Sequence, residues 1–255
     1  MASATVRGFH AQGKKAAFFS PDGDHHTIKW TGVCEDILKY NPNLARPGQE
    51  KNGNLVWLPH YKKVFAYAKY DGQKRKWLWD RSHRPTPGEF FFGSEDRIPD
   101  EINRPFIFIE PNVAWQRPTN INKDWGNGKY EALAKALMDR GHMIVQCIHN
   151  NSRRKIPGAY QVQSPLFRQA ARIMSRASLI IAPEGGNHHA AAALGVPAII
   201  LWGDWSPHSM GYDDQIKFGP GTVACGITAP CAHCRDTFNK ISVDEVYQAA
   251  IGKLG

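Results

Sequence analysis

The chain has 255 residues, enough for one large domain or two small ones that each bury a core. Hydrophobic residues make up 42% and charged residues 22%, as in folded globular proteins, and no apolar run approaches the ~20 residues that span a bilayer. The net charge of +9 favours anionic partners, either nucleotides, nucleic acid or an anionic membrane surface. The first residues lack the apolar stretch of a signal peptide, so we expect a cytosolic protein.

The first part of the chain, residues 1–100, has few regular patterns. Short apolar runs predict strands over Lys15–Ser20 and Asn54–Leu58, and the surrounding sequence is rich in proline, glycine, tryptophan and charge. We therefore expect a small, partly irregular α/β domain. The polar, proline-bearing stretch 97–105 predicts a boundary with a second domain over residues 101–255.

The second part alternates apolar runs with helical patterns. The runs predict strands at Phe106–Glu110, Met143–Cys147, Leu179–Ala182 and Ala198–Trp202. Helices are predicted at Lys129–Arg140, Leu166–Ala177, Asn187–Leu194 and Val243–Lys253. Strands that are apolar throughout and alternate with helices indicate a parallel sheet covered on both faces. Ligands of such sheets lie beyond the carboxyl ends of the strands, so the loops that follow these four strands are the candidate sites.

The strongest candidate is the turn Glu184-Gly185-Gly186, between the third of these strands and the short helix after it. Two glycines let the backbone turn tightly and approach a ligand closely. The helix that follows presents unpaired amides and the positive end of its dipole, which suit a diphosphate. Glu184 could accept hydrogen bonds from sugar or ribose hydroxyls. The alternative is an ordinary strand-to-helix turn.

Three further groups of residues point to the same edge of the predicted sheet. His188 and His189 lie in the first turn of the short helix, where an imidazole could donate to a phosphate oxygen. Lys123 follows the first strand and could reach a phosphate as a point charge, or it could be a solvated loop lysine. Gly203 and Asp204 follow the fourth strand, beside a tryptophan that could stack on a base or sugar or pack within its loop.

An acidic, histidine-rich loop follows the predicted strand Lys15–Ser20 and contains Asp22, Asp24, His25 and His26. A carboxylate at the end of a strand could act as a general base that takes the proton of an attacking hydroxyl. Asp22 and Asp24 are both candidates, and the sequence does not choose between them. An Asp-Gly pair is also typical of an ordinary turn.

The cysteines form a second pattern. Their odd number, five, without an export signal argues against a disulfide framework. Cys225, Cys231 and Cys234 lie close together, with His233 between the last two. Thiolates and imidazoles at such spacing suit zinc, but a closed zinc site usually draws on two paired clusters. The pattern therefore favours a reduced structural cluster over a zinc site.

The stretch Tyr61–Arg84 holds eight lysines or arginines against two aspartates, with aromatic residues between them. Basic groups that alternate with aromatic platforms are typical of proteins that bind nucleic acid or glycans. The alternative is a hairpin or helix with solvated charges and aromatic side chains in the core.

Several motifs of the second part occur together in one family. Asn122-Lys123-Asp124-Trp125 matches an Asn-Lys-x-Trp stretch, residues 184–191 match an acidic-x-Gly-x-x-His-x-Ala motif, and residues 193–197 match an Ala-Leu-Gly-x-Pro element. A strand into a glycine loop, a cysteine segment and a final helix follow. From residue 106 onward the chain therefore resembles the carboxyl-terminal domain of the family 9 glycosyltransferases, the heptosyltransferase-type enzymes of lipopolysaccharide assembly.

The resemblance implies a GT-B-like α/β fold, with a Rossmann-type carboxyl-terminal domain and a reduced amino-terminal α/β domain. It also implies a nucleotide-sugar donor as substrate, no cofactor and no catalytic metal. Together with the residue patterns it gives this donor-binding set: Asn122, Lys123, Glu184, Gly185, Gly186, His188, His189, Gly203 and Asp204. Family members usually carry Asp at position 184 and Thr or Ser at position 185, so the differences point away from a heptose donor.

We therefore expect an inverting glycosyltransferase that moves a sugar from a nucleotide-diphosphate sugar to a hydroxyl acceptor. The expected acceptor is a bacterial saccharide such as the lipopolysaccharide core, reached at a membrane surface without an integral membrane segment. Two alternatives stay open. The acceptor could be a modified base in nucleic acid, bound through Tyr61–Arg84, or the protein could bind a nucleotide sugar without turning it over.

Overall fold

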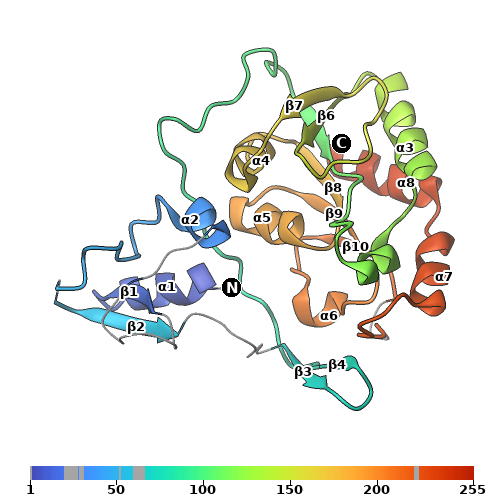
Figure 1. The fold of residues 1–255 in the computed structure, drawn as a ribbon. Coiled ribbons are helices and arrows are strands. Elements are labelled where there is room, and N and C mark those ends of the chain that lie inside the picture. Colours follow the sequence, from blue (N-terminus) through green and yellow to red (C-terminus); the bar gives the residue numbers. More distant parts are fainter. Residues whose placement is uncertain (1, 20–27, 29–31, 52, 60–66, 221–223) are drawn as a thin grey trace. The chain divides into compact units, whose positions relative to one another are not determined.

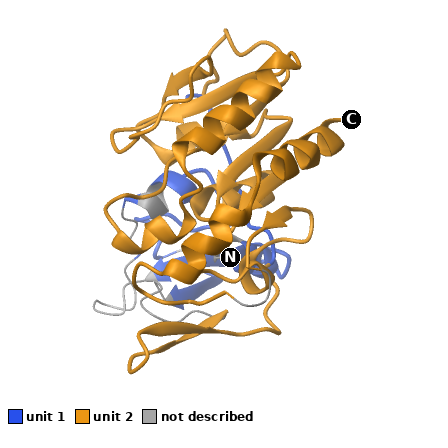
Figure 2. Cartoon of the chain, turned by 90° about the vertical axis from the view of Figure 1, so that its right-hand side faces the viewer, with its two compact units in different colours: residues 1–64, 86–96 blue, residues 65–85, 97–255 orange. Residues whose placement is uncertain are grey.

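A computed structural model describes residues 2–19, 28, 32–51, 53–59, 67–220 and 224–255. The chain forms two compact units, residues 1–64 with 86–96 and residues 65–85 with 97–255 (Figure 2). Residues 65–85 thus belong to the second unit, although they precede the boundary predicted from the sequence. In the described part of the chain, no helix combines the length and the apolar character needed to cross a membrane.

The first unit is built on two parallel strands, β1 (Lys15–Phe19) and β2 (Leu55–Pro59), as the apolar runs predict. Helix α1 (Ala2–His10) contributes Val6 to a small core with Phe18 of β1, and α2 (Val33–Leu38) contributes Leu38. Residues 86–96 return to this unit, where the Arg7 guanidinium donates to the carbonyl of Pro87 over 3.2 Å. The predicted bases Asp22 and Asp24 lie outside the described residues.

The second unit contains a six-stranded, fully parallel sheet in the order β10-β9-β8-β5-β6-β7 (Figure 1). Its strands are β5 (Phe106–Ile109), β6 (Met143–Ile148), β7 (Tyr160–Gln163), β8 (Leu179–Pro183), β9 (Ala198–Leu201) and β10 (Ile216–Phe218). Its helices are η1 (Pro118–Lys123), α3 (Asn127–Asp139), α4 (Phe167–Met174), α5 (Gly186–Leu194), α6 (Pro207–Met210), α7 (Ala232–Lys240) and α8 (Val243–Leu254). The four strands and four helices predicted from the second part are all present, which confirms the α/β class.

Successive side chains of each central strand enter two different cores. Phe106 and Phe108 of β5 pack toward α4 and α5, which supply residues such as Ile173 and Ala191. The alternate residues Ile107 and Ile109 pack toward α3 and α8, which supply among others Leu133, Leu137, Val246 and Ala250. Figure 1 shows the two helix pairs on opposite faces of the sheet. Burial on both faces explains why these strands are apolar throughout.

A hairpin of β3 (Ala68–Asp71) and β4 (Lys76–Trp79) precedes the sheet in sequence and packs with the second unit. Trp77 and Trp79 lie with ring centroids 6.1 and 5.2 Å from that of Trp205, in the loop after β9. Tyr70 remains 45% exposed. Residues 68–79 of the basic stretch therefore form a hairpin, and its tryptophans pack against Trp205.

Candidate functional site

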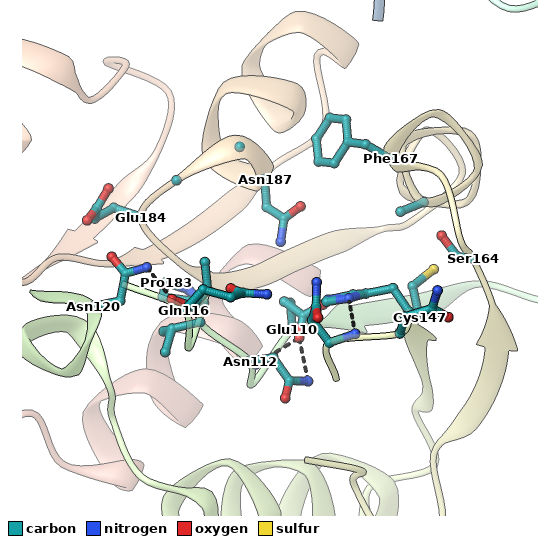
Figure 3. A pocket seen from close by; sticks show the side chains of 18 of the residues that line it. Glu110, Asn112, Gln116, Asn120, Cys147, Ser164, Phe167, Pro183, Glu184 and Asn187 are labelled. Carbon is teal, nitrogen blue, oxygen red and sulfur yellow. Dashed lines mark hydrogen bonds between the residues drawn. The ribbon is translucent and has the colours of Figure 1, made fainter. Parts of the chain in front are cut away.

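The sheet has a topological switch point between β5 and β8. Chain order runs outward through β5, β6 and β7 on one side and through β8, β9 and β10 on the other. The loops after β5 and β8 therefore diverge and leave a crevice at the carboxyl edge, the usual ligand site of such sheets. A pocket of about 810 Å³ occupies this place and is lined by residues that follow β5, β6 and β8 (Figure 3). We call it the strand-end pocket.

Glu110 closes the β5 end of the strand-end pocket. Its Oε1 accepts hydrogen bonds from the backbone amide and the side-chain amide of Asn112, over 2.8 and 2.9 Å (Figure 3). Asn112 in turn accepts at Oδ1 from the amides of Arg153 and Arg154, each over 2.9 Å. Complete burial raises the pKa of Glu110 to about 7, against the opposing effect of the Asn112 hydrogen bonds. Glu110 thus holds the loop after β6 and titrates near neutral pH.

A partly buried ion pair outside the pocket lining also holds the loop after β6. The Arg154 guanidinium binds both carboxylate oxygens of Asp124, and its Nη2–Oδ2 distance is 2.8 Å. The guanidinium carbon of Arg154 lies 4.7 Å from the ring centroid of Trp115, and that of Arg153 lies 5.4 Å from it. Bidentate pairing and stacking fix a guanidinium in one orientation. The loop after β6 is therefore anchored at several points beside the pocket.

Lys123 and Glu184 form the opposite wall. Lys123 ends η1, and its Nζ lies 3.0 Å from Oε1 of Glu184 and donates to the Glu184 carbonyl over 3.0 Å. The side chains of Lys123 and Glu184 are only 13% and 5% exposed. An ion pair with little solvent exposure is screened less than one at the surface. This is the one place on the pocket wall, within the described residues, where a lysine and a carboxylate pair directly.

The turn into α5 supplies backbone groups to the pocket. Gly185 has a φ of +147°, a conformation that favours glycine, and its amide donates to Nδ1 of His188 over 2.9 Å. Gly185, Gly186 and Asn187 line the pocket, so the first turn of α5 points into it. The amides of that turn and the positive end of the helix dipole therefore face the cavity.

The two predicted histidines do not line the pocket. His188 is fully buried, and its ring centroid lies 4.9 Å from that of Trp202. Its burial lowers its pKa well below the usual value, so the ring is neutral and accepts the Gly185 amide at Nδ1. Nδ1 of His189 lies 2.8 Å from the Tyr212 hydroxyl, and burial lowers the pKa of His189 to about 4. Both imidazole rings therefore pack into the protein interior and do not face the pocket.

Asn122, Gly203 and Asp204 also lie behind the pocket wall. Asn122 Nδ2 donates to Asp204 Oδ2 over 3.4 Å and to the carbonyl of Ala229 over 2.9 Å. A Cβ atom on Gly203 would lie 2.4 Å from the carbonyl oxygen of Asn122, so only glycine permits this approach. Burial, and then the charge of Glu184, raise the pKa of Asp204 to about 6. These residues position η1, which carries Lys123.

Of the donor-binding set predicted from the sequence, Lys123, Glu184, Gly185 and Gly186 line the strand-end pocket. Sequence reasoning took Asn122 and Lys123 from the segment after β5 but singled out no polar residue in the loop after β6. The missed lining residues include Glu110, Asn112, Cys147, His149, Ser164 and Asn187. One signal for Glu110 was available, because it follows an apolar strand just as Glu184 does.

The chain matches the model of glycosyltransferase family 9 (heptosyltransferase) over residues 89–242, which include the switch point and both pocket walls. The chain belongs to glycosyltransferase family 9. No curated protein sequence matches it.

Solved structures of such enzymes are similar in fold. The iron-containing dodecameric glycosyltransferase TibC from enterotoxigenic E. coli H10407 is 15% identical, with a TM-score of 0.59 over 94% of this chain and 76% of TibC. ADP-heptose lipopolysaccharide heptosyltransferase II from E. coli is 18% identical, with a TM-score of 0.49 over 69% of this chain. The chain spans 54% of the length of that enzyme. A family 9 glycosyltransferase from Veillonella parvula is 17% identical, with a TM-score of 0.46 over 59% of this chain and 46% of that one.

Proposed function

We propose that the strand-end pocket binds a nucleotide-diphosphate sugar and that the protein transfers the sugar to a hydroxyl acceptor. The observation that carries this proposal is the meeting of two sources of positive potential at Gly185. The Lys123 ammonium lies 3.8 Å from the position of a Cβ on Gly185, and the first turn of α5 begins at the next residue. A diphosphate placed there would be held by a point charge and by backbone amides together. Membership of family 9 supports the same reaction.

The remaining walls suit the other parts of the donor. The Glu184 carboxylate is ion-paired with Lys123, and a diphosphate that takes over Lys123 would leave this carboxylate for sugar hydroxyls. The volume of about 810 Å³ continues to the ends of β5 and β6, past Asn112, His149 and Ser164. That size is typical of sites for small molecules, and these side chains offer the few polar groups that orient a nucleoside.

We further propose an inverting reaction that uses no catalytic metal and no cofactor. Lys123 and the α5 amides can neutralise the charge that develops on the departing nucleotide diphosphate, which is the role a metal often takes. Asp24 or Asp22 would act as the base on the acceptor hydroxyl. The acceptor would be a bacterial saccharide such as the lipopolysaccharide core, because the family is that of heptosyltransferases. A net charge of +9 suits approach to an anionic membrane surface.

Donor binding can be tested by a thermal-shift screen of nucleotide sugars. A ligand at about 100 times its dissociation constant adds roughly 2.7 kcal/mol of stability, which is readily measured. Lys123→Met should weaken binding of the best ligand at least about tenfold, which is roughly 1.4 kcal/mol. Lys135→Met is the matched control, because Lys135 is exposed on α3 and pairs only with Asp139. If no nucleotide sugar raises the melting temperature of the wild type, the donor site is refuted.

Transfer is tested separately from binding. Wild type, Asp24→Asn and Asp22→Asn should bind the same nucleotide sugar, and the variant that lacks the base should lose release of the nucleotide diphosphate in the presence of acceptor. Inversion is checked by the anomeric configuration of the product. If wild type binds a nucleotide sugar but never turns it over with any saccharide acceptor, the enzyme proposal fails and a binding protein remains.

A further inference from the structure

A cluster of three cysteines and a histidine lies outside the strand-end pocket, in the segment after β10 and in the first turn of α7. We call Cys225, Cys231, His233 and Cys234 the thiol cluster. None of the four lines the pocket, and the proposed transfer reaction uses none of them. Nevertheless the fold brings together all four side chains, although Cys225 is separated from the others by a loop.

Three of the four ligand atoms of the cluster lie at distances that a single ion can bridge. Cys225 Sγ, His233 Nδ1 and Cys234 Sγ all lie within 4.8 Å of one another. Cys225 Sγ and His233 Nδ1 are 3.0 Å apart. The side chain of Cys231 interacts with those of Cys225 and Cys234 but lies outside this group of three. Three ligand atoms around one point, with a third thiol beside two of them, supply the donors of the Cys₃His set found in closed structural sites.

Both halves of the cluster are held in place by the surrounding fold. The segment that carries Cys225 runs beside β4. There the Trp77 amide donates to the Gly226 carbonyl over 2.7 Å, and the Thr228 amide donates to the Arg75 carbonyl over 3.0 Å. A Cβ on Gly226 would lie 2.4 Å from the Trp77 carbonyl oxygen, and Gly226 has a φ of +65°. Glycine is therefore required for this approach, which brings Cys225 to the cluster.

The second half is anchored to the start of α7 and to η1. Cys231 is the residue before the first turn of α7, and its amide donates to Oδ1 of the fully buried Asn122 over 2.7 Å. Cys234, in the first turn of α7, is buried, whereas His233 is exposed. The exposed His233 therefore leaves the cluster accessible to an ion from solvent, while the thiols are already held close together.

We propose that the thiol cluster binds one thiophilic transition-metal ion through the sulfur atoms of Cys225, Cys231 and Cys234 and through Nδ1 of His233. On binding, the three thiols release their protons to solvent as sulfur–metal bonds form, and no electron is transferred. The site is closed, with no position left for substrate, so the ion has a structural role. It would tie the 225–231 loop to α7 and, through Asn122, to η1. The proposal does not depend on the transferase activity.

The test is the metal content of the full chain, with Zn²⁺ as the probe. Protein purified without chelators should carry about one thiophilic ion per chain by elemental analysis. After removal of metal, it should bind added Zn²⁺ against a chromogenic chelator. Cys225→Ser and His233→Ala should each weaken Zn²⁺ binding at least about tenfold. His233→Cys should retain binding, because a thiolate can replace the imidazole as ligand.

Two controls keep the test decisive. Cys147→Ser makes the same chemical change at a buried thiol outside the cluster and should leave Zn²⁺ binding unchanged. His233 is exposed, so His233→Ala should fold and still lose affinity even if a cysteine variant does not fold. The proposal is overturned if wild type and His233→Ala bind Zn²⁺ equally weakly. It is also overturned if mass spectrometry finds a disulfide among Cys225, Cys231 and Cys234 in protein kept under reducing conditions.

Discussion

Two buried glutamates end neighbouring strands of the same sheet and differ in what neutralises them. Their backbone positions are equivalent. The Glu110 amide donates to the Ile181 carbonyl over 3.0 Å, and the Glu184 amide donates to the Leu201 carbonyl over 2.9 Å. Glu110 is held by the neutral amides of Asn112, and burial raises its pKa to about 7. Glu184 instead pairs with the Lys123 ammonium. The end of the strand therefore determines burial, and the adjacent loop determines which group binds the carboxylate.

The largest expected effect comes from removing the cation that distinguishes the two sites. Lys123→Met leaves the Glu184 carboxylate buried without its partner, which should cost on the order of 4 kcal/mol in the free energy of unfolding at pH 8. Chemical denaturation of wild type and variant measures it. Lys123→Met with Glu184→Gln should recover most of the stability. An unchanged free energy in the single variant would show that the ion pair contributes little.

The next largest effect is expected at Glu110, which is held by the amides of Asn112. The pKa of Glu110 is raised from 4.5 to about 7 in the folded protein, so the folded state binds more protons between these values. Its contribution is complete below about pH 4.5 and is lost as the pH rises to about 7, a total of roughly 3 kcal/mol. Glu110→Gln should remove this slope from denaturation curves measured between pH 4.5 and 7.5. Glu101→Gln, at an exposed position, should leave the slope unchanged. An identical slope in Glu110→Gln would refute the assignment.

A third change tests how the cation reaches Glu184. The Cβ of Gly203→Ala would lie 2.4 Å from the Asn122 carbonyl oxygen and 2.9 Å from the Lys123 Cβ, so η1 must shift. We expect a loss of about 2 kcal/mol in the free energy of unfolding and weaker binding of the nucleotide-sugar donor. Gly128→Ala is the matched control, because no atom lies within 4 Å of its Cβ position in α3. That control should raise stability by up to about 1 kcal/mol. Equal stability in both variants would show that Gly203 is not needed for close approach.

The smallest effect is expected in the pH dependence of donor affinity. As the pH rises through about 7, Glu110 ionises and adds negative charge to the pocket that would hold a diphosphate. Affinity should therefore fall several-fold between pH 6 and 8, and calorimetric titration measures it. Glu110→Gln should flatten this dependence while it retains binding at pH 6. A steeper fall in the variant than in wild type would place the titrating group elsewhere.

Buried strands of the sheet were easier to predict from the sequence than its edge strand. The segments 106–109 and 179–183 were recognisable as strands because each apolar run is buried on both faces. The strand β7 was not predicted, because its alternating Tyr-Gln-Val-Gln pattern at the edge of the sheet gives a weaker signal than a buried strand. The turn at Gly185 and Gly186 was found from the local sequence, because its two glycines and the helix after it are close together in the chain.

The roles of individual side chains were harder to predict. His188 and His189 lie in the first turn of α5, as expected, but the angle around the helix directs both rings into the protein behind the pocket. The network that joins Glu110, Asn112 and Arg154 links residues up to 44 positions apart, which no local pattern reveals.

Local patterns in the chain were enough to predict the parallel α/β unit, the strand ends that carry ligand-binding loops, and the glycine turn that precedes α5. These depend on periodicity and on backbone freedom, both of which act over a few residues. The folded structure was needed to see that Lys123 pairs with Glu184, that the Asn112 amides hold Glu110, and that Cys225 meets His233 and Cys234. Those outcomes depend on contacts between distant segments, and burial there sets both the charge of a carboxyl group and the grouping of soft ligands.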